Sequence, residues 1–126
     1  MAIAEDRRLV QLTGICAALP ESSRVVSGSH ASFIVRKKTY LYFLDDHHGD
    51  GIVSLCWRTT RSENASWVNH DASRFYLPAY LGTRGWAAVR LDVGTVDWDE
   101  VTGFVHDSYR LIAPKRLSVT LTPRQS

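Results

Sequence analysis

The period of the hydrophobic pattern is the feature that most constrains this sequence. Over residues 24–58, apolar and polar residues alternate with a period of two, and β-branched and aromatic residues dominate. This pattern is typical of β-strands, in which successive side chains point to opposite faces of a sheet. Two alternating runs, residues 32–37 and 39–45, are separated by almost nothing. They predict a tight antiparallel hairpin with Lys37 and Lys38 near its tip.

Two more strands are expected further along the chain. Asp50 and Gly51 form a strong turn signal, because glycine adopts the positive φ that hairpin turns require. Residues 45–51 should therefore be an exposed connection to a strand over residues 52–58. Another strand is predicted over residues 86–93. We expect its core face to carry Ala87, Val89, Leu91 and Val93, and its opposite face to carry Trp86, Ala88, Arg90 and Asp92.

Helical spacing and capping signals predict the first two helices. Apolar residues recur at spacings of three and four over residues 5–19, which indicates an amphipathic helix that Pro20 ends. Thr60 and Glu63 form a capping box, in which each side chain satisfies an unpaired amide at a helix start. The second helix should run to about residue 70, with Trp67 and Val68 buried.

The third helix begins at a second capping box, formed by Asp97 and Glu100, and Pro114 ends it. Its expected buried residues recur at helical spacing and are Trp98, Val101, Val105, Tyr109 and Ile112. In the tail, residues 115–126, the alternation of Leu117, Val119 and Leu121 indicates a short edge strand. The expected fold class is α+β: an antiparallel β-sheet with helices packed on one face, in the order α-β-β-β(β)-α-β-α, as one domain over residues 1–126.

Composition excludes several classes of protein. The chain is 44% hydrophobic with a net charge of +2, which excludes intrinsic disorder. Cys16 and Cys56 are flanked by apolar residues and are expected to be small buried side chains in a reducing compartment. No apolar run approaches the ~20 residues that span a bilayer, and residues 1–8 lack the pattern of a signal peptide. We therefore expect a cytoplasmic protein without a membrane partner.

Residues 45–51 hold the densest group of polar side chains. His47, His48, Asp46 and Asp50 are all of metal-ligating types, which makes them candidate zinc ligands. Adjacent side chains on an extended chain point to opposite sides, however, so His47 and His48 could share one ion only if the loop curls. The alternative is a solvated turn rich in turn-forming residues, and we expect no bound metal.

Catalytic motifs are missing from the sequence. It contains no Gly-x-Ser-x-Gly elbow, and neither cysteine lies where a thiolate would be favoured. The glycines of residues 82–85 lack the lysine of a P-loop and the dinucleotide-binding pattern, so this segment is expected to be a turn. We expect a protein that is not an enzyme and needs no cofactor.

Basic side chains gather at predicted turns and therefore form the candidate nucleic-acid site. Such tips can approach a phosphate backbone, and Trp86 on the polar face of its strand could stack on a base. The alternative is that charged tips simply protect sheet edges and maintain solubility. The candidate residues are Arg36, Lys37, Lys38, Arg84, Trp86, Arg90, Lys115 and Arg116.

Four segments together resemble the MmcQ/YjbR family of small bacterial proteins: residues 33–40, 43–51, 85–92 and 108–117. The resemblance implies an α+β fold of the CyaY-like or secretion-chaperone-like kind. It also implies a DNA-binding-like protein whose two turns form a "double wing". In this sequence the wings would fall at residues 36–39 and 82–86.

Three functions therefore stay open. The first is weak DNA binding through the basic wings. The net charge of only +2 argues against strong DNA binding. The second is a protein-interaction or chaperone-like module that binds a protein partner or forms a homodimer through an exposed aromatic patch. The third is a small-anion site built from Arg84, Arg90 and the histidine loop. The patch of the second hypothesis would consist of Tyr40, Tyr42, Trp57 and Trp86.

Overall fold

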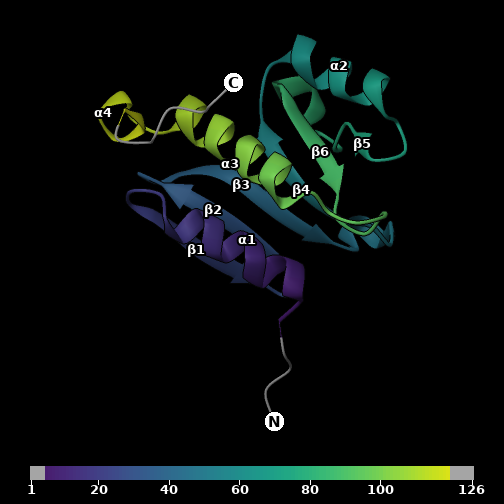
Figure 1. Ribbon diagram of the computed structural model, residues 1–126, viewed down its shortest axis with the longest axis horizontal. Coiled ribbons are helices and arrows are strands. Elements are labelled where there is room, and N and C mark those ends of the chain that lie inside the picture. The colour runs from purple at the N-terminus through teal and green to yellow at the C-terminus, as the bar shows by residue number, and fades with distance from the viewer. Residues whose placement is uncertain (1–4, 120–126) are drawn as a thin grey trace.

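A six-stranded antiparallel sheet with the strand order β1-β2-β3-β4-β6-β5 forms the centre of the molecule. The computed structural model describes residues 5–119 (Figure 1). The strands are β1 (Ser22–Ser27), β2 (His30–Val35), β3 (Lys38–Asp45), β4 (Val53–Arg58), β5 (Phe75–Tyr76) and β6 (Trp86–Arg90). The helices are α1 (Arg7–Ala17), α2 (Arg61–His70), α3 (Trp98–Ile112) and α4 (Lys115–Ser118), and two short 3₁₀ turns are η1 (His47–Gly49) and η2 (Gly82–Arg84). The expected α+β class is confirmed.

The hairpin of β2 and β3 has the predicted position. Its two turn residues, Arg36 and Lys37, both adopt positive φ, at 50° and 68°. A turn with positive φ at both central residues matches the right-handed twist of the strands that it joins. The register shifts once, between Phe33 and Ile34, where a bulge interrupts the pairing of the two strands.

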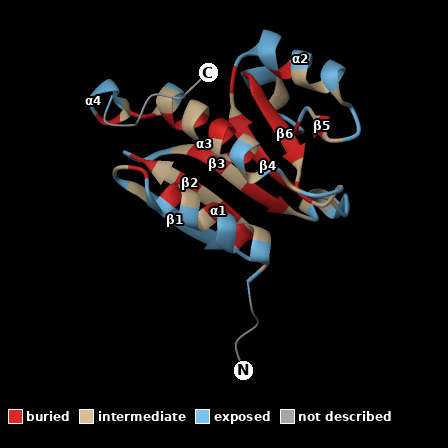
Figure 2. Ribbon diagram, viewed as in Figure 1, coloured by how far each residue is buried: buried red, intermediate tan, exposed pale blue. Residues whose placement is uncertain are grey.

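The main core lies between one face of the sheet and the helices. Helix α1 packs against β1, and α3 packs across β3 and β4 (Figure 1). Buried residues concentrate on the central strands and on the helix sides that face them, whereas β1 is largely exposed (Figure 2). At the centre of the core, the ring of Trp57 stacks on Phe104 with their centroids 4.0 Å apart. Such pairs contribute beyond the apolar area that they bury.

A second, smaller cluster lies on the opposite face of the sheet, and it corrects one expectation. Trp86 and Ala88 were expected on an open face, but they are only 6% and 0% exposed. The chain between α2 and β6 returns over this face and places Leu81 against the cluster, while Tyr42 packs on Trp86 with the ring centroids 5.3 Å apart. The indole ring therefore fills a small core and is not free to stack on a base.

Burial also contradicts the expected exposed aromatic patch. Tyr40 and Trp57 are 0% and 2% exposed and belong to the main core, and Trp86 belongs to the second cluster. Tyr42 alone of the four is half-buried. Alternation alone would place Tyr40 and Tyr42 on one face of the sheet, but the bulge in the pairing of β2 with β3 turns Tyr40 into the main core, while Tyr42 packs on the second cluster. Both faces are covered at these positions.

The helix starts agree with the predicted caps. Thr60 Oγ1 accepts a hydrogen bond from the backbone N–H of Glu63, and Asp97 caps α3 in the same way. Within α2, however, the predicted buried residues are wrong. Trp67 and Val68 are half-buried against the main core, whereas Asn64 is 2% exposed. A hydrophobic pattern cannot identify a buried asparagine, because its burial depends on hydrogen-bond partners from distant segments.

Two features near the ends of elements were not expected. Residues 115–118 form the single turn α4 and not an edge strand, because Pro114 precedes the turn and Leu117 packs against the core. The rest of the predicted edge strand, from residue 120, lies outside the described residues. The two-residue strand β5 is too short for any alternation to predict it.

None of the helices in residues 5–119 is long and apolar enough to cross a bilayer.

Candidate basic site at one end of the sheet

Basic and acidic side chains lie at opposite ends of the central strands. Strand β3 begins at Lys38 and ends at Asp45, and a rise of about 3.3 Å per residue places these residues roughly 23 Å apart. The β2–β3 hairpin tip, the last residue of β4 and the first residue of β6 share one end, because Arg58 pairs with Trp86 and β4 runs antiparallel to β3. We call this the basic end.

The opposite end of the sheet carries the acidic loop and is called the acidic end. Asp45 pairs with Val53, and the backbone N–H of Val53 donates to Asp92. The segment from Asp46 to Asp50, with η1, also lies here. The small net charge of the sequence is therefore compatible with arginines that lack an ion-pair partner at one end of the sheet and several aspartates at the other.

Three arginines at the basic end line one open pocket of about 630 Å³, which we call the arginine pocket. They are Arg58, Arg61 and Arg84, and the other lining residues are Thr59, Thr60, Ser62, Thr83 and Gly85. Among residues 5–119, no carboxylate lines this pocket. Within residues 5–119, none of the three arginines has an ion-pair partner. Six other arginines of this region do form ion pairs, so the three concentrate uncompensated positive charge.

Each arginine comes from a different element, and the contact of Gly85 with Thr59 brings two of these elements together. Arg58 ends β4, Arg61 begins α2, and Arg84 ends η2. The backbone N–H of Thr59 donates to the Gly85 carbonyl oxygen at 2.9 Å. A Cβ atom at residue 85 would lie 2.8 Å from the Thr59 carbonyl oxygen, and φ there is 92°. Only glycine combines this close approach with this backbone conformation.

Asn64 fixes the same turn from helix α2. Its side-chain Nδ2 donates to the carbonyl oxygens of Gly82 and Trp86, at 2.8 and 2.9 Å. The side chain is almost completely buried, so these bonds satisfy both donors of the amide without competition from water. The arginine pocket therefore rests on a rigid base and not on an independent loop.

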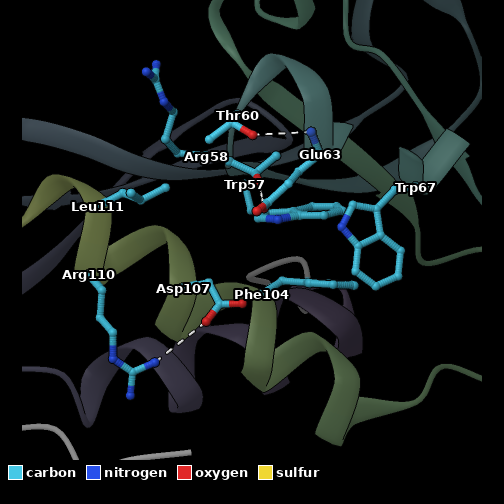
Figure 3. A pocket seen from close by; sticks show the side chains of 10 residues that line it. Trp57, Arg58, Thr60, Glu63, Trp67, Phe104, Asp107, Arg110 and Leu111 are labelled. Carbon is cyan, nitrogen blue, oxygen red and sulfur yellow. Dashed lines mark hydrogen bonds and ion pairs between the residues drawn. The ribbon is translucent and has the colours of Figure 1, made fainter. Parts of the chain in front are cut away.

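A second pocket, of about 430 Å³, lies on the other side of the β4 end, between α2 and α3, and we call it the aromatic pocket (Figure 3). Trp67 and Phe104 form part of its wall, and the Glu63 carboxylate accepts a hydrogen bond from Thr59 Oγ1 at 2.6 Å. Asp107 and Arg110 pair across 3.6 Å. Figure 3 shows the side chain of Arg58 directed away from this pocket. Glu63 thus faces the aromatic pocket, on a different side from the arginine pocket.

Two of the predicted basic residues are neutralised by carboxylates. Arg36 donates two hydrogen bonds to Glu21, at 2.6 and 2.9 Å, and this pairing lowers the pKa of the Glu21 carboxyl. Arg90 donates to Asp92 at 2.9 Å and lowers its pKa in the same way. Arg90 is also one strand length away from the predicted partner Arg84, so the small-anion site that combined Arg84, Arg90 and the histidine loop is not assembled.

The remaining predicted basic residues are exposed. Lys37 and Lys38 lie at the hairpin tip, and Arg84 lines the arginine pocket. Lys115 and Arg116 belong to α4, beside the hairpin tip (Figure 1). Arg116 is close enough to Glu21 to contribute to lowering its pKa. Trp86 is the predicted site residue that burial removes from the surface.

The acidic loop is organised by its own backbone. Asp46 Oδ1 accepts a hydrogen bond from the N–H of Gly51 at 2.7 Å, and Asp50 Oδ1 accepts one from the N–H of Ile52 at 2.9 Å. His47 packs edge-on against His30, and the side chain of His48 lies outside the described part of the structure. Among the described residues, no group of three or more His, Cys, Asp or Glu side chains could hold a metal ion.

Sequence reasoning missed Arg58, Arg61 and Asn64. The capping box at Thr60 located the start of α2 correctly, and Arg58 and Arg61 lie on either side of it. Their proximity to Arg84 depends on the pairing of β4 with β6, which joins strands separated by α2 and β5. A pairing between distant strands leaves no local signal in the sequence.

The sheet, the helices on its main face and the basic end define a small α+β protein with arginines gathered at one end of the sheet. The family model YjbR matches residues 17–111, and the chain belongs to the YjbR family. This confirms the resemblance identified from the sequence. No curated protein matches the chain.

A solved structure also has this fold. It is protein DR2400 of Deinococcus radiodurans, described as containing a domain of the DUF419 family model. The similarity covers 82% of this chain and 77% of that chain, with a TM-score of 0.67 and 20% sequence identity. At this identity, the comparison shows that the two chains share a fold.

Proposed function

We propose that this protein binds nucleic acid, with DNA as the first candidate, through the basic end of its sheet. The observation that carries the proposal is the pocket lined by Arg58, Arg61 and Arg84, in which no carboxylate compensates the positive charge. Arginine remains charged at every physiological pH, and its planar guanidinium suits phosphate oxygens. Contacts with phosphates supply most of the affinity of a protein that binds DNA without strong sequence preference.

The positions of the two wings support this proposal. One wing is the hairpin tip with Lys37 and Lys38, and the other is the η2 turn with Arg84. Strand β4 separates β3 from β6, so the two wings are rooted about 10 Å apart. This separation is similar to the ~12 Å width of the major groove of B-DNA. Arg58, at the end of β4, lies between the wings, and Arg61 lines the same pocket as Arg58 and Arg84, so these arginines can contact the same duplex.

The small net charge does not oppose this function, because the acidic end lies far from the wings. The roughly 23 Å between the two ends of β3 is well beyond the Debye length of about 8 Å at physiological ionic strength. Repulsion between Asp45 and a phosphate at the basic end is therefore largely screened. The proposed activity is binding without catalysis, in the cytoplasm, and we expect it to be weak and to fall steeply with salt.

Fluorescence anisotropy with a labelled duplex tests the proposal. The wild-type protein should bind at 50 mM salt and release the duplex at higher salt. Replacing Arg58 and Arg84 together by alanine should weaken binding about tenfold or more and reduce the salt slope by about two. Circular dichroism establishes that the double variant is folded. Flat anisotropy with the wild-type protein at high micromolar concentration contradicts the proposal.

Arg7→Ala is the matched control. Arg7 is exposed at the start of α1. The pKa of the neighbouring Arg8 is raised mainly by its hydrogen bond to Asp6, and the charges of Asp92 and Asp45 are close enough to contribute. The start of α1 therefore lies at the acidic end. Removing a positive charge there should leave the affinity for DNA nearly unchanged, so a loss equal to that of an arginine-pocket variant argues for a non-specific charge effect.

A further inference from the structure

The arginine pocket has properties that a surface for internal phosphodiesters does not need. We infer that it recognises the terminal phosphate of a nucleic-acid strand, a phosphomonoester, in preference to the diesters within the strand. This inference rests on the proposed function and assigns a ligand to Arg58, Arg61 and Arg84. The two wings would still contact the strand beyond its end.

The charge of the pocket favours a monoester. A phosphomonoester carries about −1.5 to −2 charges at pH 7, because its second pKa is about 6, whereas a phosphodiester carries one negative charge. Three guanidinium groups line the pocket, and no carboxylate does. A dianion therefore neutralises more of this charge than a diester can. Charge-assisted hydrogen bonds of this kind are roughly twice as strong as neutral ones.

The arrangement of donors also fits a terminal group. The three arginines reach the pocket from three elements: the end of β4, the start of α2 and the end of η2. A terminal phosphate presents three unesterified oxygens, whereas a diester presents two and continues on both sides. The Ser62 hydroxyl is a further donor in the lining, whereas the Thr83 hydroxyl already donates to the Tyr80 carbonyl oxygen. A group that enters end-on can be contacted from all three elements together.

The base of the pocket is preorganised for this task. Asn64 fixes the carbonyl oxygens of Gly82 and Trp86, and Gly85 packs directly on the Thr59 carbonyl oxygen. These buried contacts hold η2 against the start of α2 without any ligand. The cost of ordering a loop on binding is therefore avoided, which favours recognition of one small group.

The aromatic pocket beside it serves as an internal comparison. It shares Arg58, Thr59 and Thr60 with the arginine pocket, but Glu63 and Asp107 also line it. Arg110 also lines the aromatic pocket and pairs with Asp107, so the Glu63 carboxylate is the charge that opposes the entry of a dianion there. The difference between the two pockets assigns the phosphate to the side of η2.

The test measures binding of one 12-nucleotide DNA strand in three forms by competition against a labelled strand. The forms carry a 5′-phosphate, a 3′-phosphate or hydroxyl groups at both ends. One phosphorylated form should compete about fivefold better than the hydroxyl form, or more, because fivefold is roughly what one added hydrogen bond of ordinary strength contributes. Inorganic phosphate at millimolar concentration should reduce this preference.

Two variants locate the preference on the folded protein. Arg84→Gln should reduce the ratio between the phosphorylated and hydroxyl forms toward one. Lys37→Gln, at the hairpin tip, should weaken both forms equally and preserve the ratio. Equal affinity of the wild-type protein for all three forms overturns the inference and leaves the proposed function standing, because the strands still bind. If none of the three forms binds, the inference fails; the proposed function fails with it if the labelled duplex does not bind either, and stands if the duplex binds.

Discussion

The carbonyl oxygen of Thr59 lies so close to Gly85 that a Cβ atom there would be 2.8 Å from it. This contact joins the end of β4 to the turn before β6, and the N–H of Thr59 strengthens it by donating to the Gly85 carbonyl oxygen. Arg58 and Arg84 flank the two contacting residues and therefore line the same pocket. The structure of the basic end depends on this contact.

Gly85→Ala should destabilise the protein by roughly 3 kcal/mol or more. A side chain there adds a steric conflict with backbone to the cost of about 1–2 kcal/mol for a left-handed conformation. Gly94→Ala is the control, because φ is also positive there, at 60°, but a Cβ atom would meet open space. Urea unfolding measures both variants. Equal losses of stability would contradict the close approach of Gly85 to Thr59.

Asn64→Ala should lower the free energy of unfolding by about 1–3 kcal/mol, because the carbonyl oxygens of Gly82 and Trp86 lose the hydrogen bonds of the Asn64 amide. The carbonyl of Trp86 is the more deeply placed of the two, and the bond to it is buried. Asn69→Ala, on the exposed side of the same helix, should change stability by less than about 0.5 kcal/mol. Thermal or urea unfolding measures the stability of both variants. A loss in Asn64→Ala no larger than that in Asn69→Ala would show that Asn64 does not hold the turn.

The local structure of this protein could be predicted largely from the sequence. Alternation located the strands on either side of Lys37, and the capping residues Thr60 and Asp97 located the starts of two helices. These features depend on residues that are close neighbours in the chain. They follow from the periods of strands and helices and from the unpaired amides at helix starts.

The features that the sequence did not reveal depend on distant contacts. Trp86 alternates as an outward-facing strand residue, but the segment containing Leu81 and the side chain of Tyr42 cover it. Arg58 and Arg84 meet because β4 pairs with β6 across an intervening helix. Neither contact leaves a periodic pattern or a motif in the sequence. The identity of the arginines that form the site could therefore be found only from the fold.

Asp92→Asn should destabilise the protein at neutral pH. The difference in stability between wild type and variant should become smaller in acid. Hydrogen bonds from Arg90, and then the N–H of Val53, lower the pKa of the Asp92 carboxyl. A carboxyl with a lowered pKa contributes stability above its ordinary value of about 3.9 and loses it as pH falls through the lower value of the folded state. Urea midpoints of wild type and variant at pH 7 and pH 3 measure this. A difference that does not shrink at pH 3 would contradict the ion pair's role.

Both cysteines should be unreactive in the folded protein. Cys16 and Cys56 are 1% and 0% exposed, and burial raises the pKa of each thiol to about 12. Since the thiolate is the reactive form, a disulfide reagent at pH 8 should label neither residue until denaturant is added. Absorbance of the released thiol follows the reaction. Rapid labelling of either cysteine without denaturant would contradict its place in the core.

The most direct test of the central claim, that the basic end contacts nucleic acid, is a titration of ¹⁵N-labelled protein with a short DNA duplex, followed by amide chemical shifts. The account predicts progressive shifts at Lys37, Lys38, residues 58–62 and residues 83–85, with little change in the acidic loop over residues 45–51. Shifts centred on the acidic loop or on β1, or no shifts at a large excess of duplex, would contradict it.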